Sequence, residues 1–411
     1  MKNKLWTKDF TIITLGSVVS MLGNAVSGFA IGLMVLDYTN STLLFAVFMV
    51  VYSIPKVLLP LFIGPYLDRF SRRKMIYGLD FFSAGFYLTI ALLLYSGLFN
   101  YPLFLLLSVI VGSVDSVYTV AYESFYPTLI SEGNFSKAYS ISSLMYPIAN
   151  TIMVPVAGVL YETIGLEVLF LFNAVTFFIA ACFETRITAA ETHIRHEKNA
   201  GRFGFQKYLS DFKEGIEYLK QERGLLVITA YFFITMLAGA STSTLALPFF
   251  KNHATLTVMH FTFAMGANTL GRVVGGTIQY RFRYPAAKKF AIAMFVYTSI
   301  CFLEGSLMYL PFALMVVFNF ISGLLAVTSF NIRISATQNY VLDEKRGRFN
   351  GIFQMVTMGG NIAGQLMAGA LGEVFPIPAI VAGFMAFNLI AVFAVMFRNR
   401  EHVKPIYNRE I

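Results

Sequence analysis

Long apolar runs alternate with short polar segments along the whole chain. A run of about 20 residues is long enough to cross roughly 30 Å of hydrocarbon as a helix. Inside a bilayer only helices or closed barrels satisfy the backbone, and these runs are too long and too continuously apolar for barrel strands. The pattern therefore predicts twelve membrane-spanning helices, at residues 10–36, 43–67, 74–96, 101–126, 137–162, 166–186, 225–250, 257–281, 287–309, 312–338, 347–373 and 377–398.

The amino-acid composition is also typical of a membrane protein, and it indicates which partners to expect. Of the 411 residues, 57% are hydrophobic and 13% are charged, whereas a soluble domain is about one quarter charged. The net charge of +9 comes from short basic clusters between the apolar runs, so we expect a protein that binds the lipid bilayer and no nucleic acid. Cys182 and Cys301 lie inside apolar runs and match no metal-ligand or disulfide spacing.

The sequence carries no motif of an enzyme or an ATP-driven pump. It has no phosphate loop of the Gly-four-residues-Gly-Lys type, no metal-binding helix motif and no polar stretch long enough for a catalytic domain. We therefore expect no enzymatic activity, no cofactor and no metal site.

The basic residues predict how the chain lies across the membrane. The run at 10–36 is too long for the apolar region of a secretory signal, so we expect it to be the first span. With the N-terminus inside, 27 of the 31 Lys and Arg residues fall on the inner side, three fall within spans, and one, Lys251, falls outside. Basic residues favour the cytoplasmic side. We expect a multi-pass protein of the plasma membrane with both termini in the cytoplasm.

One polar segment, residues 187–224, is much longer than the others and divides the chain. Within it, six apolar residues recur at helical spacing opposite Lys and Glu: Phe205, Tyr208, Leu209, Phe212, Ile216 and Leu219. This pattern predicts an amphipathic helix on the inner membrane surface, and a spacer role is favoured over a regulatory one. The expected division is a six-helix bundle at 1–186, the linker at 187–224, and a second bundle with a short tail at 225–411.

The two halves repeat each other at a constant offset of 211 residues. In one region the identical pairs are Ile141/Ile352, Asn150/Asn361, Ala157/Ala368, Gly158/Gly369, Leu160/Leu371 and Glu162/Glu373. The same offset places Gly64 on Gly275 and Arg72 on Arg283. Two bundles repeated in one orientation and joined by a cytoplasmic linker are typical of transporters that rock around a central site.

The stretch "GPYLDRFSRRK", Gly64 to Lys74, carries the most specific motif. It resembles the loop signature of the major facilitator superfamily, which is Gly, three residues, Asp, a basic residue, one residue, Gly and two basic residues. The matching positions are Gly64, Asp68, Arg69, Arg72 and Arg73, with Ser71 in place of the second Gly. The resemblance covers nearly the whole chain and implies an all-α membrane protein with the major-facilitator-type fold, in which twelve transmembrane helices form two pseudo-symmetric six-helix bundles.

Two further stretches, "TQNYVLDEKRGR" and "FKEGIEYLKQERGLL", look like the bacterial branch that includes macrolide and multidrug efflux proteins. This resemblance implies an antiporter with a part in antibiotic resistance, and we expect a monomer. The exporter signature of the fifth helix is half met, by Pro155 and Gly158. Val111 stands where many proton-driven exporters carry an arginine, so the resemblance implies no proton relay there.

The resemblance also implies a gate at the inner ends of the bundles. Asp68 would accept bonds from Arg side chains and from N–H groups at the start of the helix at 347–373. Four glycines of that helix would let the helix at 43–67 approach closely: Gly359, Gly360, Gly364 and Gly369. Asp80 is expected to pair with Arg69 or Arg72 and brace the same gate.

The run at 101–126 carries a stripe of polar residues. Asp115, Thr119 and Glu123 follow at intervals of four, with Tyr118, Tyr122 and Tyr126 beside them. An ionisable side chain within a span costs about 2.5–3.5 kcal/mol, so it needs a partner or a purpose. We expect Asp115 first, and Glu123 second, to exchange a proton against the substrate, driven by about 2.3 kcal/mol per charge and 100 mV. The alternative is that both acids form static bridges with Lys56 or Arg333.

Two functions follow, and each predicts a different set of binding residues. The first is a secondary active transporter that exports amphipathic, cationic or macrolide-like small molecules against protons by alternating access. Its cavity would be lined by Tyr118, Thr119, Tyr122, Phe330 and Asn331. The second is a carrier for an anionic metabolite, lipid or siderophore, bound by Lys56, Arg272 and Arg333. The state of these three cations distinguishes the two functions: what matters is whether they face the cavity unpaired or are already paired with acids. A receptor that does not transport is a third alternative.

Overall fold

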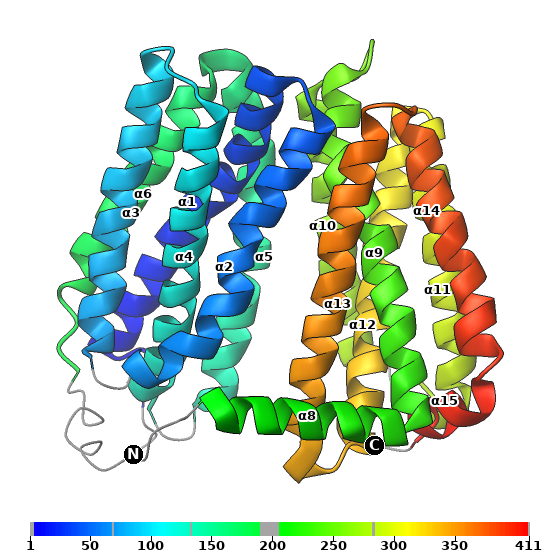
Figure 1. The fold of residues 1–411 in the computed structure, drawn as a ribbon. Coiled ribbons are helices and arrows are strands. Elements are labelled where there is room, and N and C mark those ends of the chain that lie inside the picture. The colour runs from blue at the N-terminus through cyan, green and yellow to red at the C-terminus, as the bar shows by residue number, and fades with distance from the viewer. Residues whose placement is uncertain (1–3, 68–69, 132–133, 190–204, 282–283, 410–411) are drawn as a thin grey trace. The chain divides into compact units, whose positions relative to one another are not determined.

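A computed structural model of the chain describes residues 4–67, 70–131, 134–189, 205–281 and 284–409 (Figure 1). Asp68 and Arg69, both expected at the gate, lie outside these residues. Within the described part the regular structure is helical throughout. The chain forms two compact units, one of Met1–Ser41 and Phe48–Arg202, the other of Thr42–Val47 and Phe203–Ile411. The bundle boundaries predicted at 186/187 and 224/225 stay a prediction.

Within the described residues, the first unit contains seven helical elements, and the first turns of α2 belong to the second unit. They are α1 (Lys8–Thr39), α2 (Thr42–Leu67), α3 (Arg72–Tyr95), α4 (Tyr101–Phe125), the 3₁₀ turn η1 (Tyr126–Leu129), α5 (Phe135–Ile164) and α6 (Leu166–Glu184).

Short polar side chains start three of these helices. Thr7 Oγ1 accepts from Phe10 N at 3.2 Å at the start of α1, and Ser71 Oγ accepts from Lys74 N at 3.2 Å at the start of α3. Asn100 Oδ1 accepts from Leu103 N at 3.1 Å and starts α4. Each oxygen satisfies a backbone N–H that has no partner within the first helical turn. The polar connectors therefore determine where the spans begin.

In the first unit, α6 packs against both α1 and α3. The α3–α6 contact is aromatic, because the ring of Tyr87 stacks on Phe170 and Phe177 with centroid distances of 6.3 and 5.7 Å. The α1–α6 contact uses a small residue, since the side chain of Glu184 lies directly on Gly16. Small residues allow this close approach between membrane helices, and here the approach brings an acid into the interior.

In the part of the chain that the structure describes, the second unit contains eight α-helices and three short helical turns. They are α8 (Phe205–Gln221), α9 (Arg223–Asn252), α10 (Val258–Arg281), η3 (Ala286–Lys288), α11 (Lys289–Ser306), η4 (Leu307–Tyr309), α12 (Phe312–Tyr340), α13 (Asp343–Gly372), α14 (Ile377–Ala391), the π-helical turn η5 (Val392–Phe397) and α15 (Arg400–Tyr407). The principal contacts are α10 with α12 and α9 with α13.

The internal repeat has a physical counterpart in the packing of these units. Gly112 on α4 lies against the backbone carbonyl of Tyr52 on α2. Gly323, which is 211 residues later on α12, lies against the backbone carbonyl of Asn268 on α10. In each unit a glycine at the same repeat position therefore lets the fourth predicted span of that half meet its second.

The glycines expected at the gate lie on α13. Gly360 and Gly364 lie against the backbone of Phe233 and Leu237 on α9. Gly369, farther along α13, contacts Ala46 at the start of α2. The close approach of the rest of α2 to these glycines stays a prediction.

Eight helices of the described part are long and apolar enough to cross a membrane: α1, α3, α4 with η1, α6, α9, α11 with its flanking turns, α12, and α14 with η5. Shorter apolar stretches occur in α2 and α5, at Thr42–Lys56 and Ile148–Ile164. The helices α10 and α13 have similar lengths, but they carry more glycine and polar residues. The fold class is thus confirmed as an all-helical membrane protein, while the count of twelve spans stays a prediction.

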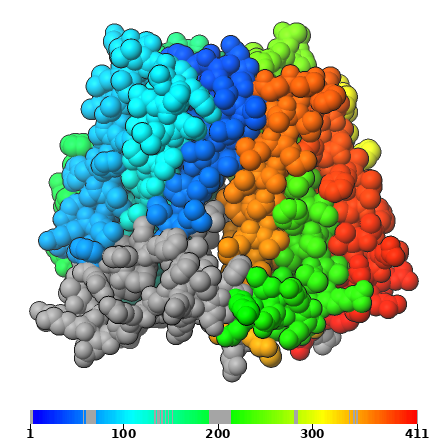
Figure 2. Space-filling view, in the orientation of Figure 1, coloured from blue at the N-terminus to red at the C-terminus, as the bar shows by residue number. Residues whose placement is uncertain are grey.

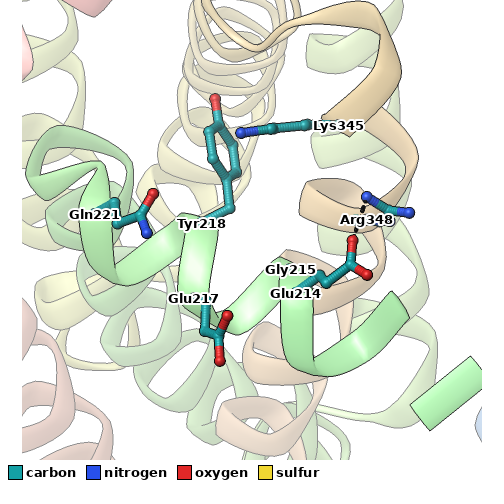
Figure 3. Close-up of a pocket in the computed structure, with 7 residues that line it drawn as sticks. All are labelled: Glu214, Gly215, Glu217, Tyr218, Gln221, Lys345 and Arg348. Carbon is teal, nitrogen blue, oxygen red and sulfur yellow. Dashed lines mark ion pairs between the residues drawn. The ribbon is translucent and has the colours of Figure 1, made fainter. Parts of the chain in front are cut away.

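The helix predicted within the linker is α8, and its second half packs against protein. Tyr218 and Leu219 are buried, and Gly215 lies against Ile352 of α13. Figure 2 shows α8 in green directly beside the end of α13 in orange. In Figure 3, Glu214 reaches Arg348 with an Oε2–Nη1 distance of 2.7 Å, and Lys345 Nζ lies 4.6 Å from the centre of the Tyr218 ring. The apolar face expected on lipid is, over these residues, part of the second unit's core.

Reversing the charge of Arg348 is expected to loosen α8. Both partners are well exposed, at 37% for Arg348 and 53% for Glu214, so the pair contributes only about 0.5 kcal/mol. Arg348→Glu should speed amide hydrogen exchange along α8, and Glu214→Arg combined with Arg348→Glu should restore the original rate. Glu217 points away from Arg348 (Figure 3), so Glu217→Arg is the matched control. Equal exchange in all four proteins would contradict the role of the pair.

Candidate functional site

The first unit encloses a cavity of about 950 Å³ lined from α1, α2, α3, α4, η1, α5 and α6. More than half of its lining side chains carry a hydroxyl group, and five of these are tyrosines. Its ionisable lining residues are Lys56, Asp80, Asp115 and Glu123. A cavity of this size is within the range that holds a drug-sized molecule. Hydroxyl groups and aromatic rings together suit a ligand with both polar and apolar parts.

Asp115 lies on the cavity wall in a three-residue network. Its Oδ2 accepts a hydrogen bond from the Tyr52 hydroxyl at 2.7 Å and lies 3.0 Å from Lys56 Nζ. Lys56 Nζ also donates to the Tyr52 oxygen at 2.7 Å. The acid is 24% exposed and the amine 37% exposed, so both face the cavity and neither needs a partner outside this unit. The arrangement matches the static bridge that the sequence left open as an alternative.

The tyrosines of α4 and η1 form a stacked ladder along the same wall. Ring centroids are 6.1 Å apart between Tyr118 and Tyr122, and 5.2 Å apart between Tyr122 and Tyr126. The Tyr126 hydroxyl donates to the carbonyl of Ala138 at 3.0 Å. Thr119 and Glu123, from the stripe predicted on this helix, also line the cavity. The structure therefore places Asp115, Tyr118, Thr119, Tyr122 and Glu123 on one cavity.

The other expected cavity residues lie in the second unit. Arg333 is surrounded by aromatic rings, with its guanidinium carbon 4.6 Å from the centre of Phe353, 5.2 Å from Phe232 and 5.3 Å from Phe330. Such contacts stabilise a cation without an acid. Phe330 is 52% exposed, and Asn331 Nδ2 donates to Gln279 Oε1 at 2.7 Å.

Arg272 is held by its own helix. Its Nε donates to Asn268 Oδ1 at 3.0 Å, and Glu304 of α11 is close enough to attract it. Each of the two second-unit cations proposed as anion ligands therefore already has favourable partners.

At the expected gate, Gly64 lies in α2 and Arg72 starts α3. Arg72 Nη1 donates to the carbonyl of Ser124 at 3.1 Å. Asp80 was expected to pair with Arg69 or Arg72, and the Arg72 pairing is not observed: no described residue donates a hydrogen bond to either Asp80 oxygen. Asp80 is two helical turns beyond Arg72, about 12 Å along the axis, which is too far for a close pair.

Sequence reasoning did not single out Glu184, an acid beside the site. It is the last residue of α6 and is fully buried next to Asp80. It lies near the end of the apolar run predicted at 166–186. The signal that points inward is the length of α6, which at 19 residues is shorter than its neighbours α1 and α3. In the described part of the chain, no three His, Cys, Asp or Glu side chains converge as a metal site would require.

Comparison with known proteins gives the family. Residues 4–405 match the family described as transmembrane secretion effector, which belongs to the major facilitator superfamily. Among curated relatives, the uncharacterized MFS-type transporter YkuC of Bacillus subtilis is 24% identical over 233 residues. Macrolide efflux protein A of Streptococcus pyogenes is 24% identical over 281 residues. The alignments cover 55% and 66% of this chain. They span about half of the first relative's length, at 53%, and 66% of the second's.

Solved structures agree on the fold. The nucleoside transporter NupG superposes with a TM-score of 0.73 at 14% identity, over 95% of this chain and 99% of its own. A bacterial homologue of the iron transporter ferroportin superposes with a TM-score of 0.69 at 13% identity, over 99% of this chain and 100% of its own. With an all-helical fold and a family match along nearly its whole length, the chain belongs to the transmembrane secretion effector family of the major facilitator superfamily, a family of multi-pass membrane transporters and not of enzymes.

Proposed function

We propose that the protein is a proton-coupled exporter of amphipathic cations or macrolide-like compounds in the plasma membrane. The observation that carries this proposal is the cavity of the first unit, whose wall combines a tyrosine ladder with carboxylates. Aromatic faces and hydroxyl groups bind the apolar and polar parts of such compounds. The 27-to-1 bias of basic residues supports a cytoplasmic position for both termini.

Asp115 is the proposed contact for the positive charge of the substrate. In the free protein the Lys56 ammonium occupies one Asp115 oxygen, so the site already holds a cation in the position a substrate would take. An arriving cation displaces Lys56 and keeps the carboxylate paired, which avoids the cost of an unpaired charge within the membrane. Glu123, farther along the same wall, is the second proposed contact.

Alternating access would follow the mechanism common to repeated bundles, with a gate that includes Gly64, Asp68, Arg69 and Arg72. Arg72 supports this role through its bond to the end of α4, which links the start of α3 to the helix that carries the cavity acids. Asp68 and Arg69 enter by resemblance alone. Antibiotic resistance and an antiport mechanism belong to the same proposal, as does action as a monomer.

The anionic-substrate alternative has one observation in its favour. Arg333 makes three contacts with aromatic rings and none with an acid of the described residues. Against it, Lys56 is already neutralised by Asp115. A carrier of anions would be expected to present free cations in its cavity.

Transport by purified protein in lipid vesicles tests the proposal. With ethidium, tetraphenylphosphonium and erythromycin as probes, a pH gradient should drive uphill movement of at least one, and a protonophore should abolish it. The same vesicles without protein are the control. Movement that ignores the pH gradient would contradict proton coupling, and movement of an anionic probe alone would favour the alternative.

A further inference from the structure

Two carboxyl groups of the first unit are buried next to each other, and no cation of the described residues pairs with them. Asp80 on α3 and Glu184 at the end of α6 are both 0% exposed, and each acts electrostatically on the other. None of their four oxygens has a hydrogen-bond partner in the described part of the chain. A buried acid is normally paired or hydrogen-bonded, so this pair requires an explanation.

The pair arises from the unequal lengths of three packed helices. Gly16 and Asp80 each lie eight residues after the first residues of α1 and α3, about 12 Å inside those helices. Because α6 ends at Glu184 and packs between α1 and α3, its last side chain lies on Gly16, at the depth of Asp80. An acid at a helix end is therefore carried into the interior of the unit.

Among the described residues, no positively charged group acts on either acid of the pair. From α4, Asp115 and Tyr118 face Asp80, and Tyr118 and Tyr122 face Glu184. From α1, Ser17 is 1% exposed and lies beside the Tyr118 hydroxyl. The Ser17 and Tyr118 oxygens are also buried and also without a hydrogen-bond partner. Four polar side chains therefore lie close together without a hydrogen bond of standard geometry among them: Asp80, Glu184, Ser17 and Tyr118.

Two ionised carboxylates at one buried point repel each other, and burial removes both from bulk water. The arrangement is stable when at least one of the acids keeps its proton, and the two then share it as a unit. Asp80, Ser17 and Tyr118 also line the cavity. The pair is therefore buried, and a proton can still reach it from cavity water.

We propose that the Asp80–Glu184 pair is the binding site of the transported proton, and that Tyr118 and Ser17 connect this pair to the cavity. This inference rests on the proton coupling proposed above. The step is a simple transfer: an O–H bond forms on one carboxylate with a proton from water in the cavity, and the same bond breaks when the proton returns to water. No other bond changes.

Asp115 couples this proton-binding pair to the substrate. Its carboxylate acts electrostatically on Asp80 across the cavity wall. A cation that binds at Asp115 adds positive charge near the pair and favours departure of the proton. A proton that binds to the pair in turn disfavours the cation. This reciprocal effect is what an exchange of proton for cationic substrate requires.

Infrared difference spectroscopy of the purified protein tests protonation without any transport. The wild type should show the carbonyl band of a protonated carboxylic acid near neutral pH, with a shift in D₂O. The band should be lost in the double variant Asp80→Asn/Glu184→Gln and kept in Glu167→Gln, which removes an acid from the opposite end of α6. Absence of the band from the wild type would overturn the proposal. These substitutions preserve shape and remove buried charge, and thermal unfolding checks that the variants fold.

Transport assays of the same proteins distinguish proton coupling from movement of the probe itself. In vesicles, the double variant should lose uphill movement of tetraphenylphosphonium driven by a pH gradient, while it retains exchange of labelled for unlabelled probe without a gradient. Wild-type uphill movement in the variant would overturn the proposal and leave the proposed function standing. Transport driven by a sodium gradient in the wild type would assign the pair to a metal cation and overturn it as well. If probe movement by the wild-type protein does not depend on the pH gradient, the result would instead contradict the proposed function itself.

Discussion

Replacement of Gly112 by valine is expected to destabilise the first unit by about 3 kcal/mol, the upper end of the usual cost of overpacking. A side chain at this position would meet the backbone carbonyl of Tyr52 and the ring of Pro55 on α2. A carbonyl that belongs to a helix backbone cannot rotate away as a flexible side chain does, so α2 and α4 must separate. The loss should appear as a lower midpoint of thermal unfolding in detergent.

A glycine on a neighbouring helix provides the matched control. An added side chain at Gly85 on α3 would have no neighbour within 4 Å, so Gly85→Val should change stability by no more than about 0.5 kcal/mol. Gly323→Val, at the repeat position in the second unit, should resemble Gly112→Val because it would meet the backbone of Asn268. Equal unfolding midpoints for Gly112→Val and Gly85→Val would contradict the close contact of α2 and α4.

Sequence patterns were sufficient for those features that depend on solvent and local geometry. Apolar runs and basic clusters identified a multi-pass helical membrane protein, because the bilayer leaves few other structures for such a chain. The starts predicted at residues 74 and 101 lie close to those of α3 at Arg72 and α4 at Tyr101. The stripe from Asp115 to Glu123 reached one cavity because positions four apart on a helix share a face.

The contacts that sequence patterns did not predict depend on how far one helix is shifted along its neighbour. Asp80 was expected to pair with Arg69 or Arg72, which are near it in the chain, whereas the structure buries it beside Glu184, 104 residues later. Hydropathy gives the ends of a span to within a few residues, yet one helical turn decides whether an acid such as Glu184 is interfacial or buried.

Replacement of Asp115 by asparagine is expected to weaken the binding of cationic probes by about 10- to 100-fold, since a hydrogen bond to a charged group contributes about 1.5–3 kcal/mol. Asparagine keeps the size of the side chain and can still accept from the Tyr52 hydroxyl, but it offers no charge to an ammonium group. Lys56 is then left without its acid, and its positive charge also repels the probe. Tetraphenylphosphonium binding by the purified protein, and its uptake into vesicles, measure the loss.

Asp37 offers a control with the same local chemistry outside the cavity, since its carboxylate accepts from the Tyr161 hydroxyl at 2.9 Å. Asp37→Asn should leave probe binding unchanged, so a loss equal to that of Asp115→Asn would indicate a general defect in the first unit. Lys56→Gln separates the two candidate functions. In an exporter of cations it frees Asp115 from its internal competitor and should strengthen probe binding, whereas in a carrier of anions it removes a ligand and should abolish transport. Because the two expectations have opposite signs, this single substitution decides which charge of the Lys56–Asp115 pair meets the substrate.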